Sequence, residues 1–125
     1  MPAWLRHLSL LLAIGWACAI YYLSSLPGVD TQPLFYHQDK LLHSAAFGAL
    51  GFLVLGAFRP SIHGHNRFQL VIAITITGTY GILDEIHQRY VPGRMPDVYD
   101  ILADFSGAAL GVWALHAIVK RRIRG

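Results

Sequence analysis

Apolar residues make up 54% of this 125-residue chain and charged residues only 14%, and the mean hydropathy is +0.44. This composition argues against an ordinary water-soluble domain and favours a protein whose surface faces lipid. The net charge of +3 does not indicate nucleic-acid binding. Four of the ten basic residues lie together at the end of the chain, after an apolar run, where they suit anionic lipid head groups.

Four apolar stretches are long enough to cross a bilayer as helices, because a hydrocarbon layer of about 30 Å needs about 20 residues at a rise of about 1.5 Å per residue. In chain order they cover about 8–26, 41–58, 68–88 and 98–119. The last two carry acidic residues at one end. We therefore predict an all-α polytopic membrane protein, a compact bundle of four transmembrane helices that forms one domain over 1–125.

The basic residues predict the orientation, since Lys and Arg accumulate on the cytoplasmic side of membrane proteins. Seven of the ten lie before the first helix, at Arg59 and Arg67 between the second and third, and after the fourth. All seven acidic residues, Asp30 among them, lie in or beside the other two loops. We expect both termini in the cytoplasm and the acidic loops outside.

Polar and small residues on the predicted outer side follow helical spacing, so that each set shares one helix face. Two stripes of this kind occur, Asp100, Asp104, Gly107 and Gly111 in the fourth helix and Thr77, Gly81, Asp84 and Gln88 in the third. Asp39 and His43 are one turn apart on the second helix. A charge inside the bilayer costs about 2.5–3.5 kcal/mol on insertion scales unless it is paired or functional. We expect three helices to direct polar groups into one volume, with the glycines forming a packing seam.

The predicted site combines carboxylates with cations and histidines. The residues expected to do acid/base chemistry are Asp84, Glu85, Asp100 and Asp104. The residues expected to bind a ligand are Asp39, Lys40, His43, His87, Gln88 and Arg94. Pro92 and Gly93 predict a type II turn that returns Arg94 over the helix ends. Arg94 and Lys40 would hold an anionic head group.

Two other interpretations of these residues stay open. The charges could form an ion-paired clamp that fixes the helix ends, in which Asp100 and Asp104 pair with Arg94 and Lys40. His43 and His87 with nearby acids could bind a metal, but the chain has neither the repeated Glu-x-x-His of di-iron bundles nor the His-Glu-x-x-His of zinc proteases. We expect no metal and no cofactor.

Four motifs, in this order, resemble the VanZ-like family of bacterial membrane proteins. They are Asp39-Lys40-x-x-His43, Tyr80-Gly81-x-x-Asp84-Glu85-x-His87-Gln88, Val91-Pro92-Gly93-Arg94 and Asp100-x-x-Ala103-Asp104-x-x-Gly107-Ala108-x-x-Gly111. The resemblance covers nearly the whole chain. It implies a place in the bacterial plasma (inner) membrane and an association with glycopeptide resistance, because the family's named member is linked to low-level resistance to teicoplanin.

These observations together predict a protein that binds or modifies a cell-envelope component at the outer leaflet, such as a lipid-linked sugar or a peptidoglycan precursor. Membrane lipids are the expected partners, and nucleic acid is not. Whether the protein is an enzyme stays open. The alternatives are an intramembrane hydrolase or transferase that acts on a head group, and a small transporter or assembly subunit whose polar cluster relays protons or substrate.

Overall fold

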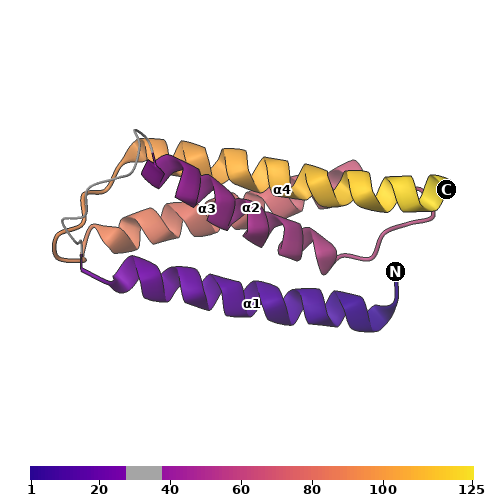
Figure 1. Ribbon diagram of the computed structural model, residues 1–125, viewed down its shortest axis with the longest axis horizontal. Helices are drawn as coiled ribbons and strands as arrows, with labels where there is room; N and C mark the ends of the chain where they lie inside the picture. The colour runs from indigo at the N-terminus through magenta and orange to yellow at the C-terminus, as the bar shows by residue number, and fades with distance from the viewer. Residues whose placement is uncertain (28–37) are drawn as a thin grey trace.

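The structure, a computed structural model, describes residues 1–27 and 38–125, so Asp30 lies outside the described residues. It contains the helices α1 (Ala3–Ser25), α2 (Gln38–Gly56), α3 (Arg67–Gln88) and α4 (Val98–Arg124). All four are long and apolar enough to cross a membrane, which confirms the predicted all-α fold. Both termini and the α2–α3 connection lie at one end of the bundle, and the α3–α4 connection lies at the other (Figure 1).

Two helices extend further than their apolar runs. α1 begins at Ala3 rather than near residue 8, and α4 continues to Arg124 rather than ending near residue 119. A helix propagates through backbone hydrogen bonds whatever the polarity of the side chains, so it need not end where the apolar run ends. The arginines in the last turn of α4 also suit the negative end of the helix dipole.

Side-chain caps fix the starts of α3 and α4. Asn66 accepts a hydrogen bond from the backbone N–H of Gln69, and the Gln69 side chain accepts one from the backbone N–H of Asn66, which forms a capping box. At α4, the Asp97 carboxylate accepts a hydrogen bond of 2.9 Å from the backbone N–H of Tyr99. These caps set where the polar residues at each helix end are presented.

α2 and α4 pack closely through a seam of small residues. A Cβ atom added to Gly48 would lie 3.1 Å from the carbonyl oxygen of Gly107. A Cβ atom added to Gly107 or Gly111 would overlap the backbone of Ser44 or Gly48. Because backbone atoms cannot rotate away, only glycine allows this approach. The predicted seam on α4 is confirmed, and it continues the face that carries Asp100 and Asp104.

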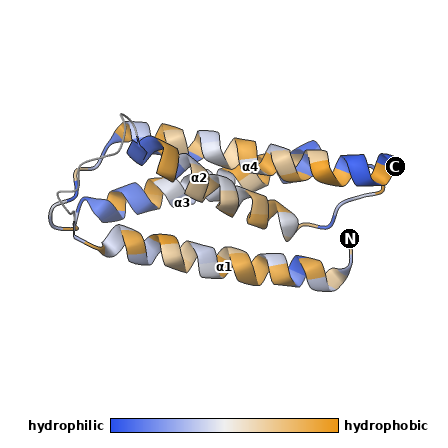
Figure 2. Ribbon diagram, viewed as in Figure 1, coloured by the Kyte–Doolittle hydropathy of each residue, from blue (hydrophilic) through white to orange (hydrophobic). Residues whose placement is uncertain are grey.

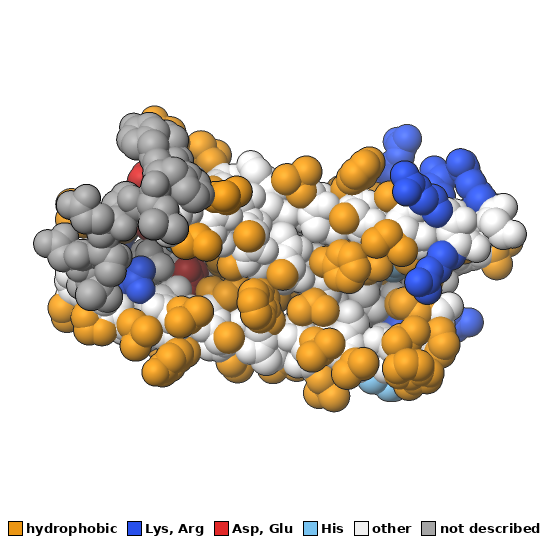
Figure 3. Space-filling model, viewed as in Figure 1, with side chains coloured by type: hydrophobic (Ala, Val, Ile, Leu, Met, Phe, Trp, Pro, Cys, Tyr) orange, Lys and Arg blue, Asp and Glu red, His pale blue; other side chains and the backbone are white. Residues whose placement is uncertain are grey.

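α1 lies on the side of α2 and α3 and makes no contact with α4 within the described residues (Figure 1). Its polar contacts to α2 are hydrogen bonds from the Ser9 hydroxyl to the Leu53 carbonyl and from the Trp16 indole to the Ala46 carbonyl. Large apolar side chains are exposed on all four helices, and they cover much of the face of the bundle that Figure 3 shows. Such faces suit hydrocarbon, as expected for membrane-spanning helices.

Candidate functional site

The start of α2, the end of α3 and the start of α4 carry hydrophilic residues at one end of the bundle, which are blue in Figure 2. We call this group the polar cluster; it consists of Lys40, His43, Asp84, Glu85, Asp97, Asp100 and Asp104. Asp84, Glu85, Asp100 and Asp104 are all buried. The three helices therefore direct polar groups into one volume, as their spacing predicts.

Lys40 is the cation of the polar cluster. Its Nζ atom lies 2.7 Å from Oδ1 of Asp100, 2.7 Å from Oδ2 of Asp97 and 2.8 Å from Oδ2 of Asp39. The Asp100 side chain is 8% exposed, whereas that of Asp39 is 62% exposed. The Asp100 pair is the least screened by solvent, so it contributes most to holding α2 against α4.

His43 lies between two carboxylates of α4. Its Nδ1 atom is 3.0 Å from Oδ1 of Asp104, and its Nε2 atom is 3.8 Å from Oδ2 of Asp100. Asp104 is completely buried and presses against α3 at Gly81, where an added Cβ atom would come within 2.8 Å of Oδ2 of Asp104. Gly81 therefore makes room for the carboxylate that orients the imidazole.

Glu85 and Asp97 connect α3 to α4. The Oε1 atom of Glu85 accepts a hydrogen bond of 2.6 Å from the backbone N–H of Asp97. Asp97 lies in the connection between the helices, and its hydrogen bonds from Lys40 and from the backbone N–H of Tyr99 hold the pKa of its carboxyl below the ordinary value of 3.8. The charged Asp97 carboxylate therefore caps α4 and pairs with Lys40 of α2.

Three buried carboxylates each have one oxygen without a hydrogen-bond partner among the residues that the structure describes. These oxygens are Oδ1 of Asp84, Oε2 of Glu85 and Oδ2 of Asp104. Buried polar atoms are nearly always hydrogen-bonded in folded proteins, so unused acceptors concentrated at one place are informative. The polar cluster has more acceptors than its own donors occupy.

Arg94 lies over the end of α1. The predicted turn is present: the backbone N–H of Arg94 donates to the Val91 carbonyl at 3.2 Å, and Gly93 has a φ of 76°. The guanidinium donates from Nε to the Leu26 carbonyl at 3.0 Å and from Nη2 to the Leu23 carbonyl at 2.8 Å. These bonds satisfy carbonyls at the α1 C-terminus.

The structure distinguishes the two cations that were proposed to form the clamp, Lys40 and Arg94. Lys40 pairs with Asp100, whereas no ion pair joins Arg94 to a carboxylate within the described part of the chain. The interpretation that Arg94 pairs with Asp100 or Asp104 is wrong, because its side chain is directed to α1. A role for Arg94 in anion binding stays a prediction.

His87 also faces α1 rather than the polar cluster. Its Nε2 atom lies 2.8 Å from the Ser25 hydroxyl, and its ring stacks on Tyr21 with a centroid distance of 4.6 Å. Gln88 is buried at the end of α3, and Asp39 is largely exposed. The residues predicted for one site are thus divided between the polar cluster and the end of α1.

Two contributors were missed by the sequence analysis. Asp97 was counted only as a loop acid, although a carboxylate directly before an apolar helix is the pattern expected of an N-cap. Ser25 contacts His87 from the end of α1, and no spacing in the sequence relates the two residues. Among the described residues, no three His, Cys, Asp or Glu side chains converge in a way that could hold a metal ion.

The helices and the polar cluster together define a polytopic four-helix membrane protein with a buried, carboxyl-rich site at one end of the bundle. The chain belongs to the VanZ/LLP1 family, whose match covers residues 9–120. This finding confirms the resemblance seen in the motifs. No curated protein and no solved structure matches the chain.

Proposed function

We propose that this VanZ/LLP1-family protein binds, at its polar cluster, the head group of a lipid-linked component of the bacterial cell envelope. The observation that carries the proposal is the set of buried carboxylate oxygens on Asp84, Glu85 and Asp104 that have no hydrogen-bond partner among the described residues. Ionisable groups in membrane spans are costly, and they are retained where they serve a ligand, a proton or a pathway.

The chemistry of the polar cluster favours a head group rich in hydrogen-bond donors. Carboxylates accept from hydroxyl and ammonium groups, which sugars and amino-sugar or peptide head groups provide. The Lys40 ammonium is already shared by three carboxylates, so acceptors rather than cations would do most of the recognition. Arg94 stays a candidate for an anionic part of the ligand, such as a phosphate, beside the end of α1.

The orientation proposed with this function puts the polar cluster at the outer face of the plasma membrane. The basic residues of the tail lie at the opposite end of the bundle, as Figure 3 shows, and positive charge marks the cytoplasmic side. In a Cys18→Ala background, cysteine at exposed Met95 should react with an impermeant maleimide in intact cells, and cysteine at Asn66 should react only after permeabilisation. The reverse pattern would invert the orientation.

Mass spectrometry of lipids that co-purify with the protein in mild detergent tests the proposed binding. Glu85→Gln keeps an oxygen that can accept from the Asp97 N–H, so the variant should remain folded while its captured lipid decreases. Asp39→Asn is the matched control, because it makes the same carboxylate-to-amide change at a residue that is 62% exposed and lies outside the polar cluster, and its lipid capture should equal that of the wild type. A wild-type protein that carries no lipid above its membrane abundance, or equal capture by Glu85→Gln, would refute the proposal.

A second candidate, an enzyme acting on the same head group, is favoured by the geometry of His43. Asp104 holds its Nδ1 atom, which leaves Nε2 as the proton-accepting nitrogen. In a hydrolysis, Nε2 would take a proton from water as the water attacks the head-group linkage, and Asp104 would stabilise the imidazolium. The bond to the leaving oxygen would break, and the imidazolium would return the proton to that oxygen. Wild-type protein incubated with a bacterial lipid extract should then form a product that His43→Gln does not, although both capture lipid. Identical lipid profiles would exclude this candidate.

Family membership leads us to infer a link to glycopeptide resistance as well. Expression in a susceptible bacterium should raise the teicoplanin concentration that inhibits growth. Glu85→Gln should remove this effect at equal protein level if resistance acts through the polar cluster, whereas an unchanged effect would separate resistance from this site.

A further inference from the structure

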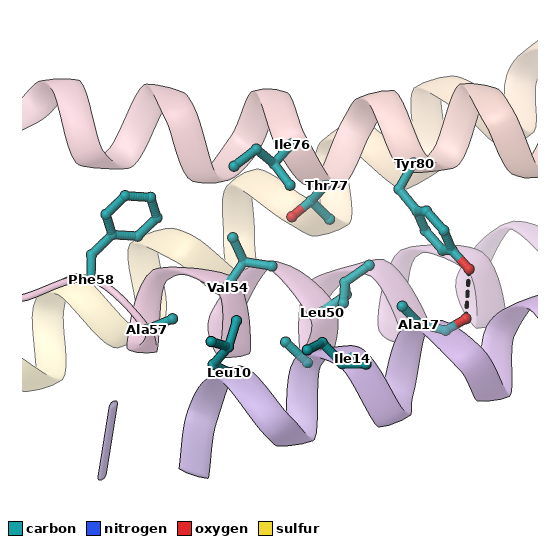
Figure 4. A pocket seen from close by; sticks show the side chains of 11 residues that line it. Leu10, Ile14, Ala17, Leu50, Val54, Ala57, Phe58, Ile76, Thr77 and Tyr80 are labelled. Atoms are coloured by element: carbon teal, nitrogen blue, oxygen red, sulfur yellow. Dashed lines mark hydrogen bonds between the residues drawn. The ribbon is translucent and has the colours of Figure 1, made fainter. Parts of the chain in front are cut away.

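An apolar groove of about 400 Å³ runs between α1, α2 and α3 (Figure 4). Nine of its eleven lining residues have hydrocarbon side chains, and the other two are Thr77 and Tyr80. Ligand pockets in proteins typically have volumes of about 300–1,000 Å³. The groove is therefore large enough to hold a ligand, and its lining selects an apolar one.

The groove lies beside the middle of α1 and α3 and extends past the end of α2 to Ala57 and Phe58. On α1 it extends from Leu10 to Ala17, a rise of about 10 Å at about 1.5 Å per residue. On α3 it includes Thr77, which is ten residues from Arg67 and eleven from Gln88. This depth corresponds to the hydrocarbon layer of a bilayer, where lipid chains rather than water surround the protein.

The end of the groove nearest the polar cluster is formed by Tyr80. Its hydroxyl donates to the Ala17 carbonyl at 2.5 Å, and Figure 4 shows this bond bridging α3 and α1. Asp84 follows one helical turn later on α3, and Ser24, buried on α1, faces the same region. A chain lying in the groove would therefore end within one turn of the polar cluster.

The shape of the groove favours a slender chain. Ala13, Ala17 and Ala57 line it with methyl groups and so leave space between the helices, whereas Ile14 and Val54 supply branched side chains beside that space. An unbranched acyl chain fits such a lining, because the methyl branches of an isoprenoid chain would crowd against these residues.

We propose that this groove binds one unbranched acyl chain of a membrane lipid whose head group lies at the polar cluster. The position of the head group rests on the function proposed above, but the binding of the chain does not. The two parts can fail separately, and the experiment is designed to distinguish them.

The test is photolabelling with phosphatidylethanolamine that carries a diazirine at the middle of one acyl chain, with the protein reconstituted in phosphatidylethanolamine and phosphatidylglycerol vesicles. Labelled sites are mapped by mass spectrometry. Wild-type protein should be labelled at buried groove residues such as Ala13, which is 5% exposed, in preference to Leu11, which is 66% exposed on the same helix. Ala17→Leu fills the groove and should abolish this preference, whereas Cys18→Leu changes an exposed neighbour outside the groove and should not.

Ala57→Leu fills the opposite end of the groove and should have the same effect, which keeps the test decisive if Ala17→Leu does not fold. Equal labelling of groove and outer faces, or groove labelling that survives both filling variants, would overturn the proposal. Stronger groove labelling by a diazirine-bearing polyprenyl phosphate would overturn the choice of an acyl chain.

The head group is tested by comparing this probe with phosphatidic acid carrying the same labelled chain. A preference for the ethanolamine head group that Glu85→Gln removes supports both parts. Groove labelling that is identical for the two head groups would support the groove and count against the polar cluster as the head-group site.

Discussion

Replacing Gly111 with alanine tests whether the α2–α4 seam determines the stability of the bundle. The added Cβ atom would overlap the carbonyl oxygen of Gly48, and the helices must separate because a backbone atom cannot move aside alone. Overpacking of this kind costs about 1–3 kcal/mol, and we take the upper end because the obstacle is backbone. Alanine regains about 1 kcal/mol of helix propensity over glycine. We therefore expect a net loss of about 2 kcal/mol in the free energy of unfolding.

Gly15 provides the matched control for this substitution. It lies on α1, and a Cβ atom added there would meet nothing within 4 Å. Gly15→Ala should therefore stabilise the protein by up to about 1 kcal/mol through helix propensity alone. The same chemical change is thus expected to have opposite signs at the two positions.

Reversible unfolding in mixed detergent micelles, followed by circular dichroism, measures both free energies. The separation of α2 from α4 should also lengthen the Lys40–Asp100 ion pair, so Gly111→Ala should lower lipid capture at the polar cluster. A Gly111→Ala protein as stable as the wild type would refute the reasoning, as would an equal loss in Gly15→Ala.

Three further predictions concern charged residues. Lys40→Met leaves the buried Asp100 carboxylate without its cation and should lower the free energy of unfolding by about 3 kcal/mol. Adding Asp100→Asn should recover most of that loss, and no recovery would contradict the pairing. Arg94→Ala removes two hydrogen bonds to α1 and should lower the free energy of unfolding by about 1–2 kcal/mol. Arg94→Lys should lose less stability, and an unchanged melting temperature in both variants would exclude a capping role. Burial lowers the pKa of His65 below the ordinary value of 6.5, and the charge of nearby His116 lowers it further. The His65 imidazole therefore binds a proton less readily in the folded state than in the unfolded state. The stability that the neutral ring confers is present above about pH 6.5 and is lost as the pH falls through the folded-state pKa. Between pH 7.5 and 5, acidification should therefore lower the melting temperature of the wild type relative to that of His65→Gln. An identical pH dependence in the two proteins would show that His65 does not contribute.

Helical spacing was sufficient to predict the main features of the bundle end. Asp100, Asp104, Gly107 and Gly111 share a face because residues three and four apart are neighbours on any helix, and the structure places that face against α2. The turn at Arg94 was predictable for a similarly local reason, since a glycine is needed where φ is positive.

The choice of partners could not be predicted from the sequence. Arg94 and Lys40 were equivalent candidates for the carboxylates, and what separates them is where α1 ends, 68 residues away from Arg94 in the chain. The turn brings the guanidinium to that helix end, where two of its N–H groups donate to carbonyls of α1 rather than to an acid. The groove could not be predicted from the sequence either, because its space depends on how α1 lies against α2 and α3.

The seam that joins α2 to α4 constrains how the protein is made. The partners of Lys40 and His43 lie on a helix that is synthesised later, and His43 and Asp104 are 61 residues apart. At about 5–20 residues per second, translation of that interval takes roughly 3–12 seconds. During this time α2 has neither of its α4 partners, and Lys40 has only Asp39 beside it. The place of Lys40 and His43 in the first two turns of α2 keeps them in reach of water while they wait, whereas the same side chains two turns deeper would face hydrocarbon for the whole interval.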